Sequence, residues 1–483
     1  MKGKQIVAID VGSSNVVIAV GSLLEDGNVD ILGIVTEPVS GVMSGRVENN
    51  EMVARAIATA KSKIEKQLNM HITEAYVAMS GDYIRYAQVE DHVYVQNEGI
   101  TRHDLEELDR RMRMVPAPDD RETILSIEPL RYMIDDKETE EPIGTYGHVL
   151  KATYSFVLCE KKMRDRLAHC IKSQGITVKE FVPLNSISHL GIATTDEVAD
   201  GAIVIDLGSG LTDVSVVQSG KVRYAASIPM GANAINDDIR SLSITKYVED
   251  LKVGYGSAIA DRCEDDLIVF PQKYHIMVKS ILRRNLVIAI EARLMEIAGW
   301  VKKEIKEAKC GSRFRPAVLL TGGGSKMTDI EHLFARELGY DDVRVVYPEY
   351  GITSESQINH ITTPAYSSVV SLLIYGAKRG LCAVSILPTP ATPASPVTPA
   401  IAPKRDVVRP TIPPVREEPK PEPVEQSKSA GSVAPQQVDE AKDERITDAG
   451  PDVERPSKFK KLWKGWMNKM ANSMSDDGDH DLE

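Results

Sequence analysis

The sequence contains few cysteines, and none of them has the spacing of a metal site. Five occur in 483 residues, without a Cys-x-x-Cys pair or a histidine at a ligand spacing: Cys159, Cys170, Cys263, Cys310 and Cys382. Neither a disulfide framework nor a zinc site is therefore predicted, and a reducing cytoplasm is the simplest expectation. The ten histidines also lack a ligand spacing, so we interpret them as structural or surface residues.

Long hydrophobic runs are absent as well. No stretch approaches the roughly 18 apolar residues that a membrane-spanning helix needs. Residues 1–5 lead into a strand pattern without the apolar region of a secretory signal. We therefore expect a protein that is neither exported nor membrane-spanning. The formal net charge of −12 argues against a general affinity for nucleic-acid phosphates, so any contact with a membrane must be local.

Aromatic residues are absent between Leu387 and Ser457, a segment that holds more than half of the 26 prolines. Such a segment cannot bury enough apolar surface to offset the entropy lost on ordering. We predict a disordered, proline-rich linker over residues 385–457, so that the folded part ends near residue 385. The remaining length is enough for two or more domains.

The folded part contains one short pattern twice. Residues 5–21 and 202–220 each consist of an apolar run, a turn of small residues and a second apolar run, which predicts a β-hairpin. The turns match residue by residue: Asp10 with Asp206, Gly12 with Gly208, and Ser13 with Ser209. Two matched hairpins almost two hundred residues apart indicate a duplicated core, in which each half contributes one turn to a shared cleft.

The residue types in these turns suit a bound phosphate. Glycine lets the backbone approach a phosphate closely, and backbone N–H groups and serine hydroxyls donate to phosphate oxygens. The aspartates at the strand ends, Asp10 and Asp206, are expected to hold Mg²⁺ through water. Either turn taken alone is more simply an ordinary tight turn, and only the matched pair favours the phosphate interpretation.

A third glycine-rich element follows at residues 318–325, where VLLTGGGS is an apolar run that ends in three glycines. Residues 328–331 resemble a capping box that opens a helix through about Leu338. A strand, a glycine turn and a helix N-terminus favour binding of a ribose and an α-phosphate. An ordinary β–α connection is the alternative, and for this element alone it is the simpler interpretation.

The order and spacing of the three elements resemble the superfamily of actin, DnaK-type chaperones and sugar kinases, over residues 5–384. The resemblance implies an α/β fold of the two-lobed, actin-like (ribonuclease H-like) type. Within this superfamily, several stretches resemble the FtsA family, whose members link FtsZ filaments to the bacterial membrane. They are residues 75–83 (AYVAMSGDY), Pro142 to Leu150, residues 228–239, Glu249 and Lys252 in YVEDLKVGYG, and Glu291 to Glu296.

An inserted unit is expected at residues 84–160. Strand-like runs at residues 92–96 and 153–159 and a charged helical stretch at residues 102–114 predict a small α+β unit there. The resemblance implies that this unit is an SHS2-like subdomain 1C, which contacts the neighbouring subunit in a filament. It also implies the remaining division of the chain: subdomain 1A over residues 1–83 and 161–200, and subdomains 2A and 2B over residues 201–384.

The resemblance implies ATP and Mg²⁺ as ligands. The family usually has threonine at Ser13 and a second glycine at Ala232, but both departures leave hydroxyl and backbone donors in place. No residue within 181–189 can be assigned as a water-activating base, so the catalytic residue stays open and at most weak ATPase activity is expected. The expected nucleotide-binding residues are Gly12, Ser13, Ser14, Asn15, Gly208, Ser209, Gly210, Thr212, Gly231, Glu249, Lys252, Gly322, Gly323, Gly324 and Ser325.

Residues 458–474 have the pattern of an amphipathic helix with Ser457 as its N-cap. A helix of about 25 Å cannot cross a bilayer, but it can lie in a surface that contains anionic lipid. Docking on a partner or on the protein's own core is the alternative, and the long linker argues against the core. Phe459, Leu462, Trp463, Trp466, Met467 and Met470 occupy one sector, opposite Lys460, Lys461 and Lys464.

The implied partners are FtsZ, further copies of the chain, membrane lipids and other division proteins, at the cytoplasmic face of the bacterial inner membrane at the division septum. Lys279, Arg283 and Arg284 could meet the acidic tail of FtsZ, although such a run is more often a solvated face. The leading hypothesis is a membrane-anchored cytoskeletal adaptor. A sugar or acid kinase would have no evident use for the tail, and a pilus-assembly homologue is not expected to combine the insertion with a membrane-binding C-terminus.

Overall fold

The computed structural model describes residues 5–96, 99–242, 247–270, 279–310, 314–353 and 361–386. The predicted amphipathic helix at residues 458–474 lies outside the described residues, as does the linker from residue 387 onward. Within the described ranges, no helix is long and apolar enough to cross a membrane.

The first lobe is built on a six-stranded sheet in the order β12-β7-β1-β2-β3-β20. β1 and β2 are antiparallel neighbours, so the first predicted hairpin is confirmed. Residues 16–20 of β2 are all buried because helices cover both faces of the sheet. The strands are β1 Gln5–Val11, β2 Asn15–Leu23, β3 Val29–Pro38, β7 Glu74–Met79, β12 Thr177–Pro183 and β20 Ile352–Thr353.

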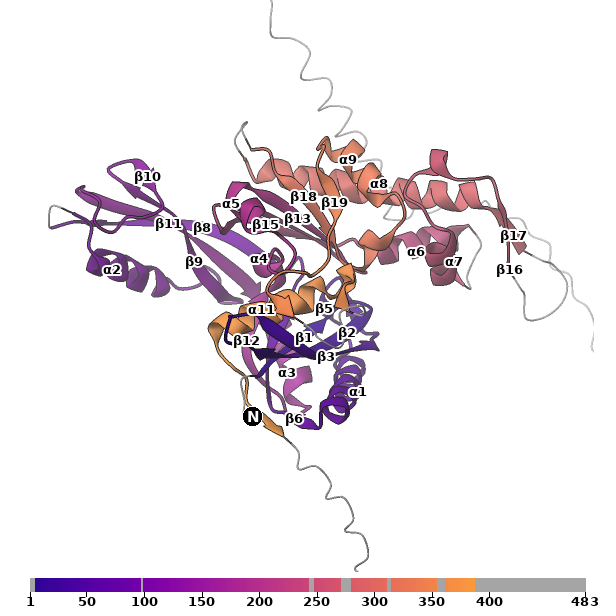
Figure 1. The fold of residues 1–483 in the computed structure, drawn as a ribbon, viewed down its shortest axis with the longest axis horizontal. Helices are drawn as coiled ribbons and strands as arrows, with labels where there is room; N and C mark the ends of the chain where they lie inside the picture. The colour runs from indigo at the N-terminus through magenta and orange to yellow at the C-terminus, as the bar shows by residue number, and fades with distance from the viewer. Residues whose placement is uncertain are drawn as a thin grey trace, which may run out of the picture. The chain divides into compact units, whose positions relative to one another are not determined.

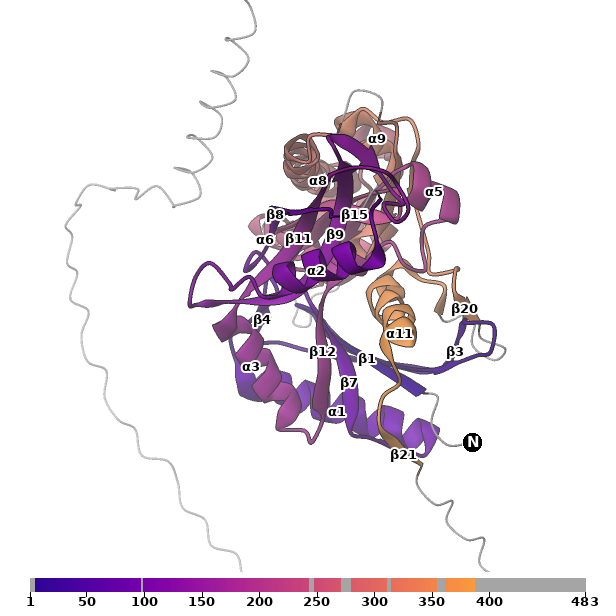
Figure 2. The ribbon, with the colours of Figure 1, turned by 90° about the vertical axis from the view of Figure 1, so that its left-hand side faces the viewer.

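Three helices enclose this sheet. α1 (Asn50–Leu68) and α3 (Lys161–Lys172) pack together on one face, and α11 (Ser367–Arg379) packs on the other, as Figures 1 and 2 show. Asn49 caps α1 by accepting a hydrogen bond from the Met52 N–H. The resulting core brings together residues from both ends of the folded chain.

The second lobe repeats this arrangement on a five-stranded sheet in the order β15-β14-β13-β18-β19. β13 pairs antiparallel with β14 and parallel with β18, as β1 does with β2 and with β7. The second predicted hairpin and the duplicated core are therefore confirmed. The strands are β13 Ala202–Leu207, β14 Thr212–Gln218, β15 Lys221–Ile228, β18 Ala317–Thr321 and β19 Val343–Val345.

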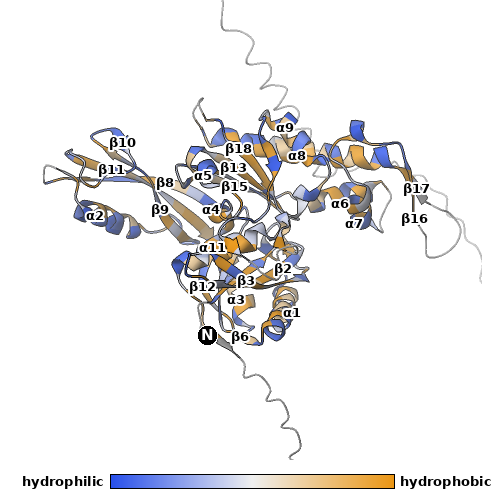
Figure 3. Cartoon of the chain, in the orientation of Figure 1, coloured by the Kyte–Doolittle hydropathy of each residue, from blue (hydrophilic) through white to orange (hydrophobic). Residues whose placement is uncertain are grey.

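The helices of the second lobe are amphipathic, and hydrophobic and hydrophilic residues alternate along them in Figure 3. The long α8 packs against α6 and α9 and buries one row of aliphatic side chains from Leu286 to Ile305. These helices are α6 Ala232–Ser241, α7 Val248–Tyr255, α8 Arg283–Glu307 and α9 Ile330–Leu338. Two short helices lie beside them: α5 Thr195–Asp200 contacts β14, and α4 Leu184–Ile187 contacts both α11 of the first lobe and β15 of the second.

The expected inserted unit forms a four-stranded sheet in the order β10-β9-β11-β8, with α2 (Arg102–Arg113) packed against it. Thr101 and Asp104 form a capping box at the start of α2. The run expected at residues 92–96 is strand only as far as Tyr94. The strands are β8 Ile84–Tyr94, β9 Glu122–Ile134, β10 Lys137–Thr139 and β11 Val149–Glu160.

Several short elements complete the described fold. β21 pairs with β6, so the fold continues to Ile386, slightly beyond the predicted start of the linker. The others are paired hairpin strands or single turns of 3₁₀ helix: β4 Val42–Met43, β5 Arg46–Val47, β6 Met70–Ile72, β16 Leu267–Phe270, β17 Lys279–Leu282, β21 Val384–Ile386, η1 Ala260–Arg262, η2 Gly323–Lys326 and η3 Pro364–Tyr366.

The capping box predicted at residues 328–331 is wrong, although α9 ends at Leu338 as expected. The residue that caps α9 is Asp329, in a left-handed conformation and without a side-chain cap. Asp329 instead accepts hydrogen bonds from Ser257 and Arg262. Glu331 accepts one from the backbone of Val345 on β19. Both acidic side chains therefore serve tertiary contacts, which override the local capping pattern.

Candidate nucleotide cleft

The two matched turns face one small cavity. It has a volume of about 100 Å³, and its walls include residues of both turns. Asp10 is the penultimate residue of β1, and Asp206 is the penultimate residue of β13, so the duplicated hairpins present equivalent carboxylates. From the predicted set, the walls include Asp10, Gly12, Ser13, Asp206, Gly208, Ser209 and Gly210.

A larger cavity of about 580 Å³ adjoins the small one, because Ser209 lines both. Its volume is in the range of pockets for nucleotide-sized ligands. Ser14 and Asn15 of the first turn meet the glycine-rich turn and α7 here. The predicted residues that line it are Ser14, Asn15, Ser209, Glu249, Lys252, Gly323 and Gly324.

Three carboxylates line the small cavity: Asp10, Asp206 and Asp213. Burial, with a smaller contribution from the charge of Asp213, raises the pKa of Asp10 to about 6 and that of Asp206 to about 7. Burial also raises the pKa of Asp213. A divalent cation beside these groups would remove their mutual repulsion, which suits Mg²⁺.

Direct metal ligation is not favoured by the spacing of these groups. The described residues contain no group of three or more His, Cys, Asp or Glu side chains that could hold a metal ion. Ser368 Oγ already donates to Asp206 Oδ2 at 2.9 Å. The carboxylates fit Mg²⁺ that keeps several of its waters, as this cation commonly does beside phosphates.

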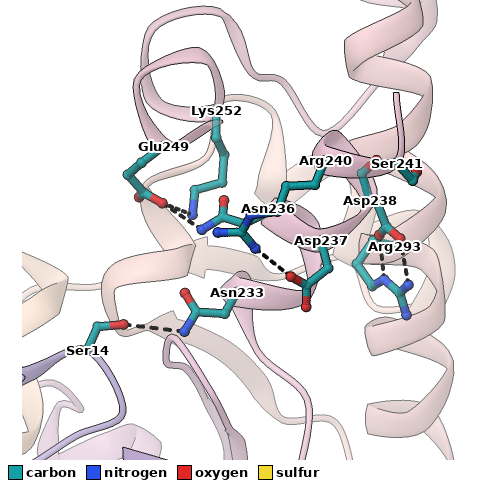
Figure 4. Close-up of polar contacts among 10 residues, drawn as sticks. All are labelled: Ser14, Asn233, Asn236, Asp237, Asp238, Arg240, Ser241, Glu249, Lys252 and Arg293. Carbon is teal, nitrogen blue, oxygen red and sulfur yellow. Dashed lines mark hydrogen bonds and ion pairs between the residues drawn. The ribbon is translucent and has the colours of Figure 1, made fainter. Parts of the chain in front are cut away.

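The larger cavity contains an ion pair. Lys252 Nζ lies 2.8 Å from Glu249 Oε2, and the Asn236 amide donates to the same oxygen at 2.8 Å. Figure 4 shows these side chains pointing toward one another between α6 and α7. The cavity therefore offers both a cation and an anion to the hydroxyl and ring nitrogen atoms of a ligand.

One contact in Figure 4 joins the two lobes across the cleft. The Asn233 amide on α6 donates to Ser14 Oγ of the first turn at 3.4 Å. Both residues line the larger cavity. A ligand placed between them would therefore touch both lobes at once.

Four of the predicted residues support the turns instead of lining either cavity. A Cβ on Gly322, which has a φ of +84°, would lie 2.2 Å from Asp206 Oδ1, and one on Gly231 would lie 2.6 Å from the Gly208 carbonyl oxygen. Glycine is therefore required at both positions, where the backbone touches the second matched turn. Thr212 donates to the Met230 carbonyl, and Ser325 donates to the Gly322 carbonyl.

The structure adds cavity residues that the sequence did not reveal. Asp213, Ser80 and Ser368 line the small cavity, and Asn233 lines the large one. Asp213 follows the second glycine turn by only a few residues. In the sequence it is one of several polar residues interspersed with valines, so nothing marked it as a cavity residue. Ser80 and Ser368 come from remote segments that only the tertiary fold brings close.

Of residues 181–189, only the apolar Leu184 lines one of the two cavities, and Arg283 and Arg284 line neither. His189 is the only ionisable side chain within residues 181–189, and burial lowers its pKa to about 4. Arg284 pairs with Asp261 at 3.0 Å, and Arg283 Nε donates to the Tyr255 carbonyl. The side chain of Lys279 lies outside the described part of the structure.

Comparisons with known proteins agree with this architecture. A model of the cell division protein FtsA matches residues 203–371, and a model of the SHS2 domain inserted in FtsA matches residues 81–158. FtsA of Pseudomonas aeruginosa is 28% identical over 381 residues, covering 78% of this chain and 90% of the relative. FtsA of Escherichia coli K12 is 27% identical over 391 residues, covering 78% and 91%.

A solved structure shows the same fold at lower identity. A chain of the PilM-PilN type IV pilus biogenesis complex is 14% identical, with a TM-score of 0.57, and the match covers 77% of this chain and 98% of that one. This likeness concerns the fold alone, whereas the SHS2 match identifies the insertion. The predicted two-lobed α/β fold is confirmed, and the chain belongs to the FtsA family of bacterial cell-division proteins, which have an actin-like ATPase fold.

Proposed function

We propose that the protein binds ATP with Mg²⁺ in the cleft, assembles with further copies of itself and anchors FtsZ filaments to the cytoplasmic membrane at the division septum. The observation that carries the proposal is the convergence of both matched turns on one cavity that three carboxylates line. The membership of the protein in a family of cell-division proteins supports the proposed cellular role.

In this proposal the nucleotide lies across both cavities. Its phosphates occupy the small cavity, where backbone N–H groups and the hydroxyls of Ser13 and Ser209 donate to them. Asp10 and Asp206 hold Mg²⁺ through water. The ribose and base occupy the larger cavity between Glu249, Lys252 and the glycine-rich turn. Mg²⁺ neutralises phosphate charge, and the residues of the chain position the triphosphate.

Self-assembly is assigned to the subdomain at residues 84–160. Its four-stranded sheet has its own core around Leu108 and Tyr154, so it can present a contact surface as a rigid unit. Tyr94, Met114 and Tyr146 are exposed on it, each by more than two thirds of its area. Exposed large apolar side chains on one unit are typical of a protein contact.

The hairpin β16–β17 is proposed as the FtsZ contact. Leu267 and Val269 are 59% and 57% exposed, and Leu282 at the end of β17 is 44% exposed. Arg283 and Arg284 follow directly in the chain. Apolar side chains beside cations suit an acidic peptide with hydrophobic anchors.

Membrane attachment is assigned to residues 458–474. The aromatic and methionine side chains would enter the headgroup region, and each lysine near anionic lipid would add on the order of 1 kcal/mol. A random coil of the linker's length spans roughly 45 to 50 Å. The folded part would thus stand off the membrane and still reach a filament.

Co-sedimentation with liposomes in the presence of ATP tests the anchor. We expect the full chain to pellet with vesicles that contain phosphatidylglycerol, and a chain ending at Ser457 to stay in the supernatant. Replacing Trp463 and Trp466 with glutamate should reproduce the loss, whereas the same change at the exposed Met43 should not. Equal pelleting of the full and truncated chains would exclude the helix as the anchor.

A further inference from the structure

A chain of hydrogen bonds leads from the inserted subdomain to the carboxylates of the cleft. The Tyr86 hydroxyl on β8 donates to the side-chain oxygen of Asn185, and Ser186 Oγ lies 2.9 Å from the same hydroxyl. The Asn185 amide nitrogen donates to Ser227 Oγ at 3.4 Å, and Ser227 Oγ donates to Asp213 Oδ1. Each donor therefore points toward Asp213, whose carboxylate only accepts.

The second oxygen of Asp213 is held from another direction. Ser80 Oγ donates to Asp213 Oδ2 at 2.5 Å. Ser80 belongs to the turn between β7 of the first lobe and β8 of the insertion, whereas Asp213 lies on β14, opposite Asp206 on β13. The Asp213 carboxylate is only 5% exposed. It thus joins the second lobe to the root of the insertion, by which we mean the segment around residues 80–84 where the chain enters the inserted subdomain.

This series of hydrogen bonds separates two cavities. Asp213 lines the small cavity of the cleft, whereas Tyr86 and Ser227 line a further cavity of about 440 Å³ between β8 and β15. This second space is the seam between the inserted subdomain and the second lobe. A displacement of Asp213 on the cleft side would break its hydrogen bond with Ser227 unless Ser227 followed, and a movement of Ser227 would in turn leave the buried Asn185 amide, which is 1% exposed, without this partner.

Hydrogen bonds that are linked in series respond together to a change at one end. Aligned hydrogen bonds polarise one another in a low-dielectric interior, so a change at one end alters the bonds along the whole chain. A triphosphate and a diphosphate differ in the charge placed at the terminal phosphate position. If that position lies beside Asp213, the two nucleotides interact differently with the chain, which is the requirement for shifting a conformational equilibrium.

We propose that Asp213 is a positioning residue that couples the terminal phosphate in the cleft to the inserted subdomain through Ser227, Asn185 and Tyr86. The inference rests on the proposed function, since it requires a nucleotide in the cleft. It assigns no bond-breaking step to Asp213. It states that the seam between β8 and β15 takes different arrangements with a triphosphate and with a diphosphate.

Hydrogen exchange measured by mass spectrometry on the full chain tests the coupling. Exchange is compared with Mg²⁺ and either the non-hydrolysable analogue AMP-PNP or ADP, in peptides that cover residues 84–94 and 221–228. The wild type should exchange at least twofold more slowly at the seam with AMP-PNP than with ADP. The Tyr86→Phe variant removes one hydroxyl at the far end of the chain and should lose this difference.

Tyr94→Phe is the matched control, because Tyr94 lies on the same strand but is 73% exposed. It should keep the wild-type difference. Affinity for a fluorescent ATP analogue should be within twofold of the wild type in both variants. Asn185→Ala provides a second break in the chain and should behave as Tyr86→Phe does, so the outcome does not depend on one substitution.

The outcomes separate this inference from the proposed function. Failure of the wild type to bind the ATP analogue would overturn both. Normal binding with a seam difference that persists in Tyr86→Phe and Asn185→Ala would overturn only the coupling. Normal binding with no difference between AMP-PNP and ADP at the seam of the wild type would overturn it as well.

Discussion

Lys252 Nζ lies 2.8 Å from Glu249 Oε2, one turn away on α7, yet the two side chains differ greatly in exposure. The Lys252 side chain is 9% exposed, and that of Glu249 is 62% exposed. A largely buried ammonium needs a hydrogen-bonding partner, and Glu249 is itself oriented by Asn236 at 2.8 Å. Glu249 therefore fixes the direction in which Lys252 points within the larger cavity.

Replacement of Glu249 by alanine should weaken nucleotide binding about tenfold, which corresponds to about 1.4 kcal/mol. The variant loses a carboxylate that can accept from the ribose, and it leaves Lys252 without its oriented partner. Titration with a fluorescent ATP analogue measures the effect. Glu51→Ala is the control, because its pair with Arg55 is also within one helix but lies on the exposed surface of α1. Equal nucleotide affinities for the two variants would show that Glu249 does not contribute to nucleotide binding.

Gly322 and Gly323 are neighbours in one turn and should respond differently to alanine. A Cβ on Gly322, at a φ of +84°, would lie 2.2 Å from Asp206 Oδ1, whereas one on Gly323 has nothing within 4 Å. Gly322→Ala should lower the free energy of unfolding by about 1 to 3 kcal/mol, and Gly323→Ala should leave it nearly unchanged. Chemical denaturation without nucleotide measures both. Similar losses would show that the turn tolerates no side chain at all.

The stability of the nucleotide-free protein should fall between about pH 4 and pH 8. Asp10 and Asp206 have pKa values raised to about 6 and about 7 by burial, so the folded state holds protons that the unfolded state has already released. The stabilising contribution is complete below pH 4 and is lost as the pH rises through these values. Asp206→Asn cannot ionise, and its melting temperature should decline less over this range.

The affinity for magnesium should depend on pH in the opposite direction, rising as the pH rises. The cation favours the ionised carboxylates, so protons compete with it. Its affinity in the presence of a non-hydrolysable ATP analogue should rise between pH 6 and pH 7.5, as isothermal titration calorimetry can measure. An affinity that is the same at both pH values would remove Asp10 and Asp206 from the cation site.

The sequence predicted the hairpins because their signal is local. Alternating apolar runs around Gly12 and Gly208 define both the strands and the turns, and the repeat itself indicates that the two turns share a cleft. The helix of the insertion was also predicted, because the charged stretch at residues 102–114 corresponds to α2, and the capping box of Thr101 and Asp104 became apparent only in the structure.

The contacts that the sequence could not reveal depend on remote segments. Ser80 in a turn, Ser227 on β15 and Ser368 on α11 reach the carboxylates from three different places in the chain, and a single serine carries no pattern of its own. The capping box at residues 328–331 was wrong for the related reason that Ser257, Arg262 and Val345 take over its acidic side chains. Local patterns predict elements well, but they do not show which polar side chains meet between them.

Arg46 connects both ends of the insertion. Its Nε donates to Asp82 Oδ1 at 2.9 Å just before β8, and its guanidinium lies 3.4 Å from Glu160 Oε1 at the end of β11. The adjacent Gly45 N–H donates to Ser13 Oγ of the first glycine turn at 3.4 Å. Arg46 thus holds the root of the insertion beside the cleft.

Arg46→Ala should speed hydrogen exchange at both ends of the insertion and lower the free energy of unfolding by about 1 kcal/mol, since an arginine side chain that is 29% exposed is partly screened by solvent. Arg110→Ala removes a guanidinium whose pair with Glu107 stays within α2, so it should leave the root unchanged. If both variants exchange like the wild type, the ladder between β8 and β11 holds the root without help from Arg46. Faster exchange in Arg46→Ala alone would place the anchor of the insertion in the first lobe, next to Gly45, which donates a hydrogen bond to the first glycine turn.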